Sequence, residues 1–246
     1  MVTKKKNINE KKKIKQDLFI ESILKITEAI TSDLYIEDIL KLIVTVTAEV
    51  LNSPICSLLL LEERKKELCV RATQSISEHY NKKPNIKLGE GIAGMVAKTG
   101  KAMTSNDVRK DNNYLNRDIA IKEHLCSLLC VPLIFKGNII GVLNMYTSKP
   151  RDFSSDEINI LKSVASQAAI VIENFRLVVE SQVIKEELET RKAIERAKGI
   201  LMKKQKLSED DSYTLLRKFS MDHRKSMREV SEAIILSEDM REFATR

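Results

Sequence analysis

The chain has 246 residues, of which 43% are hydrophobic and 31% charged, and it contains no Trp. This length supports one large or two small domains with a substantial core, and an aromatic content of only 4% argues against a stacking platform for single-stranded nucleic acid. The net charge of +7 is unevenly placed: residues 1–16 carry seven Lys against one Glu, and residues 191–206 carry seven basic side chains against Glu195 alone.

The cysteines and the apolar segments indicate a cytoplasmic protein. The four cysteines form no CxxC pair, so we expect reduced thiols. No apolar run approaches the roughly 20 residues of a membrane span, and none follows the basic N-terminus as it would in a signal peptide. The spacings of a phosphate-binding loop, a zinc protease and a serine hydrolase are all missing from the sequence, so we expect no enzyme activity.

The first half of the chain predicts two helices and a strand hairpin. We expect residues 1–16 to be a basic arm. Apolar residues then recur at helical spacing over residues 18–30 and again over residues 36–50. Residues 55–61 and 67–73 predict two strands joined by a charged turn, followed by a polar connection.

The next elements are a short helix and a second hairpin. The segment from residue 88 to 101 is rich in glycine and predicts a helix that ends at Gly100. Residues 104–118 contain many Asn and Asp, which is typical of a loop. Residues 127–135 and 139–146 predict two more strands, joined by a tight turn around Gly137.

The last third of the chain predicts helices only. Residues 156–206 contain no Pro and one Gly, which predicts a helix of roughly 50 residues, capped by Ser154 or Ser155, against a mean of about 11–12. Its apolar residues recur at three- and four-residue steps, so we expect it to pack on the sheet and to pair with a second copy as a homodimer. Two short helices, over residues 208–220 and 226–236, complete a three-helix core with residues 194–201.

Residues 17–177 resemble a GAF domain. The resemblance rests on GEGIAGMVAKTGK, on CVPLIFKGNIIGVLNMY and on FSSDEINILKSVASQAAIVIEN. It implies an α+β fold with a central antiparallel sheet flanked by helices. It also implies a small-molecule ligand, whose identity the fold does not determine, and we assign no cofactor.

Residues 188–246 resemble an ANTAR domain, joined to the first domain by a helical linker, residues 178–187. The resemblance rests on AKGILM at residues 197–202 and on LLR at residues 215–217. Ser212, Ser220 and Ser231 stand where the family commonly has Ala. The resemblance implies an all-α three-helix domain that binds paired RNA hairpins in a leader transcript and prevents a terminator from forming.

The basic segment of the long helix is the predicted RNA contact. With 3.6 residues per turn, Arg191 and Lys198 share a face while Ala197 and Leu201 turn inward. We therefore expect the cations to point outward, where phosphates reach them. A Gly inside a helix costs about 1 kcal/mol relative to Ala, so Gly199 indicates close approach by another helix or an RNA backbone. The predicted RNA-binding residues are Arg191, Lys192, Arg196, Lys198, Gly199, Lys203, Lys204 and Arg217; the alternative is a solvated charged face.

Four residues are candidates for contact with a GAF ligand. Asp107 and Asn113 lie in the loop that often borders the pocket of GAF domains. Cys126 and Cys130 are four apart on a predicted strand and would share one face. They are either a redox- or metal-sensing pair or two small buried apolar groups.

The sequence thus predicts a signal-responsive transcription antitermination regulator, gated by its GAF domain. The alternative from another class is a small-molecule or redox sensor whose C-terminal helices dock a partner protein. A third, a cyclic-nucleotide-responsive enzyme regulator, is disfavoured because Asn144 is followed by Met145 and not by the Lys of the family's cyclic-nucleotide binders. Salt dependence separates the first two, because RNA binding weakens steeply with salt.

Overall fold

The computed structural model of the chain describes residues 36–75, 77, 80 and 83–244. The chain forms two compact units, one ending at Phe175 and the next beginning at Arg176. The expected basic arm and the expected helix over residues 18–30 lie outside the described residues. No helix in the described ranges has the length and apolar character that crossing a membrane requires.

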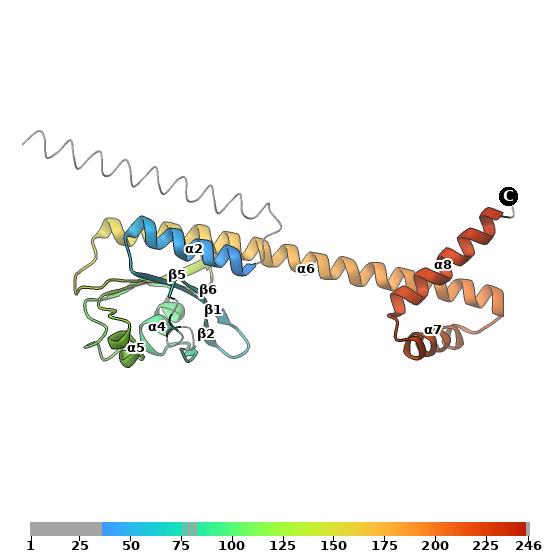
Figure 1. Ribbon diagram of the computed structural model, residues 1–246, viewed down its shortest axis with the longest axis horizontal. Helices are drawn as coiled ribbons and strands as arrows, with labels where there is room; N and C mark the ends of the chain where they lie inside the picture. Colours follow the sequence, from blue (N-terminus) through green and yellow to red (C-terminus); the bar gives the residue numbers. More distant parts are fainter. Residues whose placement is uncertain (1–35, 76, 78–79, 81–82, 245–246) are drawn as a thin grey trace, which may run out of the picture. The chain divides into compact units, whose positions relative to one another are not determined.

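The first unit is built on a six-stranded antiparallel sheet in the order β3-β2-β1-β6-β5-β4 (Figure 1). The two predicted hairpins form its centre, because β1 pairs with both β2 and β6. The short edge strands β3 and β4 lie in segments expected to be loops, since two or three residues carry no readable alternation. The bounds are β1 Ile55–Glu62, β2 Glu67–Thr73, β3 Ile86–Lys87, β4 Met103–Ser105, β5 Leu128–Phe135 and β6 Asn138–Tyr146.

Helices cover both faces of this sheet (Figure 1). The helix α2, Ile36–Leu51, packs with the start of α6 on one face. The helices α4, Gly91–Thr99, and α5, Arg117–Lys122, lie on the other. Residues of β5 alternate between the two cores, with Leu129 in the first and Leu128 in the second. The sheet is therefore buried on both faces, which explains why its central strands are apolar along most of their length.

Two local features fix the central hairpin. Lys136 and Gly137 both have positive φ, 48° and 84°, which suits the two-residue turn that joins β5 to β6. In β6, a Cβ added to Gly141 would lie 2.2 Å from the carbonyl oxygen of Leu59 in the neighbouring strand. Only glycine allows β1 to approach β6 this closely.

The helix α6 runs without interruption from Ser155 to Gln205 and crosses the boundary between the two units. Its first turn is closed by a capping box in which the Ser154 amide donates to Glu157 at 2.9 Å and the Glu157 amide donates to the Ser154 hydroxyl at 3.2 Å. The predicted long helix and its serine cap are confirmed.

The second unit adds α7, Glu209–His223, and α8, Met227–Ala244, to the end of α6. Its buried apolar core consists of Ala197, Leu201, Leu216 and Val230. The helix α8 continues eight residues beyond the predicted end at Leu236. Tyr213, Leu215 and Phe219 of α7 are 46%, 38% and 50% exposed, because the three helices meet along narrow stripes only.

Candidate nucleic-acid interface and ligand pocket

The last turns of α6 expose one face and bury the opposite one. Ala197 and Leu201 are buried, whereas Gly199 is exposed. A Cβ added to Gly199 meets no atom within 4 Å in the described chain. At about 100° per residue, Gly199 lies near the middle of the exposed face, and four cationic residues of α6 lie within about 80° of it. These four are Arg191, Lys192, Arg196 and Lys203, and together with Gly199 we call them the cationic face.

Two cations of this segment tie α6 to α8. The guanidinium of Arg196 lies 2.7 Å from a carboxylate oxygen of Asp239, and Lys204 forms an ion pair with Glu238. Exposed ion pairs of this kind contribute at most about 1 kcal/mol. An incoming phosphate therefore has to displace these carboxylates, but at a modest cost.

The remaining exposed cations are less engaged. Lys192 pairs with Glu189 on α6 itself, at 3.0 Å. No carboxylate among the described residues lies within ion-pair distance of Arg191 or Lys203, which are on α6, or of Arg217, which is on α7; all three are exposed. These three are the predicted cations that reach solvent without an internal competitor.

Lys198 differs from the expectation that all these cations point outward. Its side chain is only 9% exposed, and its ammonium lies 2.7 Å from Glu209 and 3.1 Å from Glu195. Hydrogen bonds to Glu209 and then to Glu195 favour the charged ammonium and raise the pKa of Lys198. Because Glu209 begins α7, this ion pair fastens α7 to α6. The burial of Lys198 could not be predicted from its spacing of seven residues from Arg191, because its partner Glu209 lies on another helix.

Serine caps begin both terminal helices. The Ser208 hydroxyl accepts a hydrogen bond from the Asp211 amide at 3.1 Å. Ser226 and Glu229 form the reciprocal box, with distances of 2.8 Å and 3.1 Å. The backbone hydrogen bond from Ser226 is the main reason why the pKa of Glu229 falls to about 2.

The serines that stand at alanine positions of the ANTAR pattern satisfy their own hydroxyls. Ser212 and Ser231 are fully buried, and each donates to the carbonyl four residues earlier, at 2.8 Å and 2.7 Å. Ser220 donates to the carbonyl of Lys225 at 2.5 Å, across the end of α7. The exchanges thus leave no buried hydroxyl unpaired in this bundle.

A second candidate site lies in the first unit, where three tyrosines surround a lysine on the α4 face of the sheet. The rings of Tyr80 and Tyr114 meet Tyr146 edge to face, with centroids 6.3 Å and 6.4 Å apart. The ammonium of Lys83 lies 3.6 Å from the centroid of Tyr80 and 3.3 Å from the hydroxyl of Tyr114. We call this group the tyrosine pocket.

Burial shapes the chemistry of the tyrosine pocket. It raises the pKa of Tyr114 to about 12 and lowers the pKa of Lys83 to about 7. Asn144 of β6 lines the same cavity, is 4% exposed, and its amide oxygen has no hydrogen-bond partner. The cavity has a volume of about 20 Å³, room for about one water.

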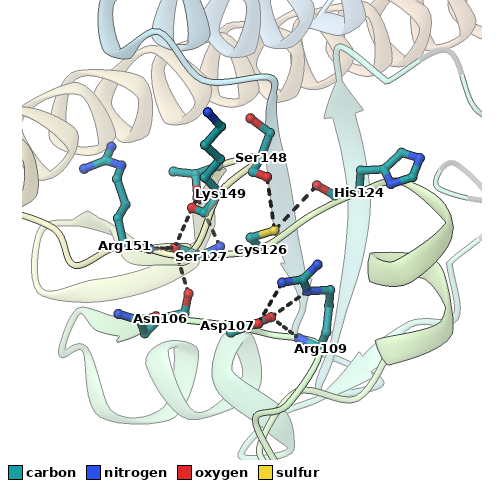
Figure 2. Close-up of polar contacts among 10 residues, drawn as sticks. Asn106, Asp107, Arg109, His124, Cys126, Ser127, Ser148, Lys149 and Arg151 are labelled. Carbon is teal, nitrogen blue, oxygen red and sulfur yellow. Dashed lines mark hydrogen bonds and ion pairs between the residues drawn. The ribbon is translucent and has the colours of Figure 1, made fainter.

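The structure does not bring the four predicted ligand-contact residues to this pocket. Asp107 lies elsewhere and binds Arg109 with both carboxylate oxygens, at 2.8 Å each (Figure 2). This pairing is the main reason why the pKa of Asp107 is lowered. Asn113 lies in the loop before α5, and its backbone N–H donates to the carboxylate of Asp111 at 2.8 Å. A polar residue inside the apolar strand, Asn144, was the signal in the sequence that marked the pocket.

The two candidate cysteines are both buried, but only one of them lies in a strand. Cys126 precedes β5, and its thiol donates to the carbonyl of Ser148 at 3.2 Å (Figure 2). Cys130 lies within β5 and has no exposed surface, and burial raises the pKa of its thiol. The expected shared strand face is therefore wrong, because only one of the two belongs to the strand. No group of three potential metal ligands occurs in the described part of the chain.

Comparisons with known proteins agree with the two units. A family model described as GAF domain matches residues 34–173, and one described as ANTAR domain matches residues 182–235. Among solved structures, a GAF domain of a phosphoenolpyruvate-protein phosphotransferase from Coxiella burnetii has a TM-score of 0.58 at 24% identity and covers 66% of this chain and 96% of that one. The corresponding Acinetobacter domain has a TM-score of 0.55 at 24% identity and covers 65% and 95%.

Two curated relatives match different parts of the chain. A methyl sulfide methyltransferase-associated sensor from Methanosarcina acetivorans is 28% identical over 125 residues, which are 49% of this chain and 12% of that protein. The transcriptional regulatory protein PdtaR from Mycobacterium tuberculosis is 39% identical over 56 residues, which are 23% of this chain and 27% of PdtaR. The chain thus spans a minor part of each relative.

Proposed function

The chain belongs to the GAF domain family and carries a C-terminal ANTAR domain, and from this premise we propose that it regulates transcription by antitermination, binding paired RNA hairpins in leader transcripts under the control of its GAF domain. The two domains and the similarity to PdtaR support a regulator with a sensor domain.

The observation that carries the proposal is the position of Gly199 at the centre of the cationic face. Inside a helix this Gly costs about 1 kcal/mol relative to Ala, and no contact within the described chain needs the missing side chain. Arg191 and Lys203 lie on either side of it, without internal partners among the described residues. A bare backbone flanked by cations is suited to a phosphate backbone that approaches closely.

Dimerisation through α6 is supported by large apolar side chains of this helix that are exposed to solvent. Leu177, Val183, Ile184 and Leu188 are 50%, 50%, 66% and 51% exposed. Leu177 and Ile184 are seven residues apart, and Leu188 follows four later, which is the spacing of a coiled-coil seam. A dimer presents two cationic faces, one for each hairpin of a pair.

One observation favours the second candidate, a docking module for a partner protein. A groove of about 540 Å³ runs between the three helices of the C-terminal unit. It is lined by Ile200, Leu215, Phe219 and Ile234, and Phe219 is half exposed. Such an apolar groove would bind through burial of apolar surface and not through charge.

The test measures binding of the full chain to a paired-hairpin leader RNA and to a scrambled RNA of equal length over a range of salt concentrations. We expect preference for the hairpins and an affinity that falls steeply with salt. The double variant Arg191→Glu/Lys203→Glu should abolish binding. The double variant Lys122→Glu/Lys162→Glu, an equal change of charge at exposed positions of the first unit, should leave it unchanged. Equal binding of both RNAs, or no response to the double variant, contradicts the proposal.

A further inference from the structure

The tyrosine pocket contains two polar groups that the described chain leaves without adequate partners. We propose that it binds a small carboxylate bearing a hydrogen-bond donor on the neighbouring carbon, such as a 2-hydroxy or 2-amino acid. Lys83 and the hydroxyl of Tyr114 hold the carboxylate, and the amide oxygen of Asn144 accepts from the donor. The inference deepens the proposed function, and rests on it in assigning this acid as the signal that the GAF domain senses.

Asn144 provides the first argument. Its side chain sits in the middle of β6, where Asn144 pairs with Ser57 of β1 and Cys130 of β5. The amide oxygen is buried and unpartnered, and leaving such a group unsatisfied costs about 1–3 kcal/mol. Buried polar groups are nearly always satisfied in folded proteins, so this oxygen indicates a donor supplied from outside the chain.

Lys83 provides the second argument. Among the described residues, no carboxylate lies within ion-pair distance of its ammonium, and the carboxylate of Glu123, which acts on it through space, is hydrogen-bonded to Ser77. The ammonium rests instead on the ring of Tyr80. Removal from water disfavours its charge, and a bound anion reverses this effect. A carboxylate is therefore the complement that the pocket lacks.

The volume of the pocket limits the size of the ligand. The cavity of about 20 Å³ admits about one water while Lys83 covers Tyr80. A ligand of a few carbon atoms enters when the flexible Lys83 side chain swings off the ring, and its carbons then contact the aromatic faces that the lysine stem leaves. Ile92 and Ala93 of α4 line the same cavity, so a bound ligand would contact the helix that covers this face of the sheet.

The chain offers its own spectroscopic probe for this site. It has five Tyr and no Trp, so tyrosine dominates its fluorescence, and three of the five surround the pocket. We would titrate the full chain with glycolate, L-lactate, glycine and L-alanine. Three compounds serve as controls. Acetate lacks the hydrogen-bond donor, and L-lactamide lacks the negative charge. Tetramethylammonium is a cation, which would occupy the aromatic rings in place of the Lys83 ammonium if the pocket bound cations.

We expect a saturable change in tyrosine fluorescence with at least one of the four acids. Acetate and lactamide should bind at least tenfold more weakly than that acid, and tetramethylammonium should not compete with it. The inference is overturned when none of the four acids gives saturation, or when lactamide or tetramethylammonium binds as tightly as the acids do.

Two variants separate a ligand role from a structural one. Lys83→Met keeps most of the length of the side chain and removes its charge, and it should abolish binding of the acid. Asn144→Leu, of similar volume, should also abolish binding but raise the melting temperature, because the unpartnered oxygen is gone. A lower melting temperature for Asn144→Leu together with retained binding in Lys83→Met would show that both residues serve the fold alone.

The hairpin titration on the same preparations keeps the two proposals apart. Hairpin binding without any response to the acids rejects the ligand and leaves the antitermination proposal in place. Saturation by an acid without hairpin binding supports the pocket and rejects the RNA target. When both occur, the acid should change the hairpin affinity of the unaltered chain and not that of Lys83→Met.

Discussion

The two units of this chain are stabilised by different means. The first packs apolar side chains on both faces of a sheet, and its two cores include Leu143 and Leu128 among many fully buried residues. In the second, four apolar residues are buried among those that the structure describes, and the unit relies on serine caps and on ion pairs between helices, such as Lys198 with Glu209. Burial is little affected by salt, whereas exposed ion pairs are screened by it. The unit proposed to bind RNA is therefore the one whose structure responds to ionic conditions.

The largest effect on stability should come from truncating one buried side chain in each core. Leu143→Ala and Leu216→Ala each remove a buried side chain, with an expected loss of about 2–5 kcal/mol in the free energy of unfolding. Because the second core is so small, Leu216→Ala should unfold α7 and α8 while the sheet stays folded. Unfolding in urea, monitored by amide hydrogen exchange in each unit, measures the loss of stability and shows which unit unfolds. Loss of protection in the sheet of Leu216→Ala would show that the two units unfold together.

Two glycines sharpen the comparison, because one is required by the fold and the other is not. In Gly141→Ala the new Cβ would collide with the carbonyl of Leu59, so we expect a strongly destabilised sheet. In Gly199→Ala the Cβ meets nothing, so the helix should gain about 1 kcal/mol in stability. Thermal melts of both variants measure this. Hairpin affinity should nevertheless fall in Gly199→Ala, and unchanged affinity would remove the argument for close approach at this site.

The first unit was the easier to predict from sequence. The helical spacing of apolar residues, the apolar strand segments and the turn at Gly137 locate α2 and the two hairpins to within a residue or two, because these signals act locally. The edge strands were missed because they are short, and α5 because it has only six residues and begins at the end of a segment rich in Asn and Asp. The serine cap of α6 was predicted because it is contained within four residues of sequence.

The candidate sites were harder to predict because their partners come from distant parts of the chain. The tyrosine pocket combines Tyr80, Lys83, Tyr114 and Tyr146, which no spacing rule connects. The burial of Lys198 depends on Glu209, on another helix. Helical periodicity correctly placed Ala197 and Leu201 inside and Gly199 outside, but it cannot show which cations already have a carboxylate.

The response to alkali should distinguish the units. The pKa of Lys83 falls from its ordinary value of 10.5 to about 7 on folding, so between these pH values the unfolded chain binds more protons than the folded one. The stability of the first unit should therefore rise with pH from neutrality, by up to about 1.4 kcal/mol per pH unit. Lys83→Met should remove this rise and leave the C-terminal unit unaffected. Unfolding at a series of pH values tests it, with an equal rise in both chains as the contradicting result.

A smaller effect separates positioning cations from binding cations in the second unit. Lys198→Met leaves Glu195 and Glu209 without their shared partner, so the melting temperature of that unit should fall. The salt dependence of hairpin binding by the folded fraction should be unchanged. Lys203→Met should leave the melting temperature unchanged and reduce the salt slope by about one. If instead Lys198→Met reduces the salt slope, we would conclude that the Lys198 ammonium of the unaltered chain moves away from the two glutamates and contacts phosphate when RNA binds.

The smallest effect should come from the cap of α8, where charge and hydrogen bonding can be separated. The pKa of Glu229 falls from 4.5 to about 2 on folding, so its charge stabilises the C-terminal unit above the ordinary value, and this contribution is lost as pH falls through about 2. Glu229→Gln keeps a partner for Ser226, because Gln also completes a capping box. The variant should be slightly less stable than the parent chain at neutral pH, because the charge is gone, and it should lose less stability on acidification. Melting curves of the C-terminal unit at neutral and acidic pH measure the difference. A large loss already at neutral pH would mean that the carboxylate charge, and not the hydrogen-bonded box, holds this helix end.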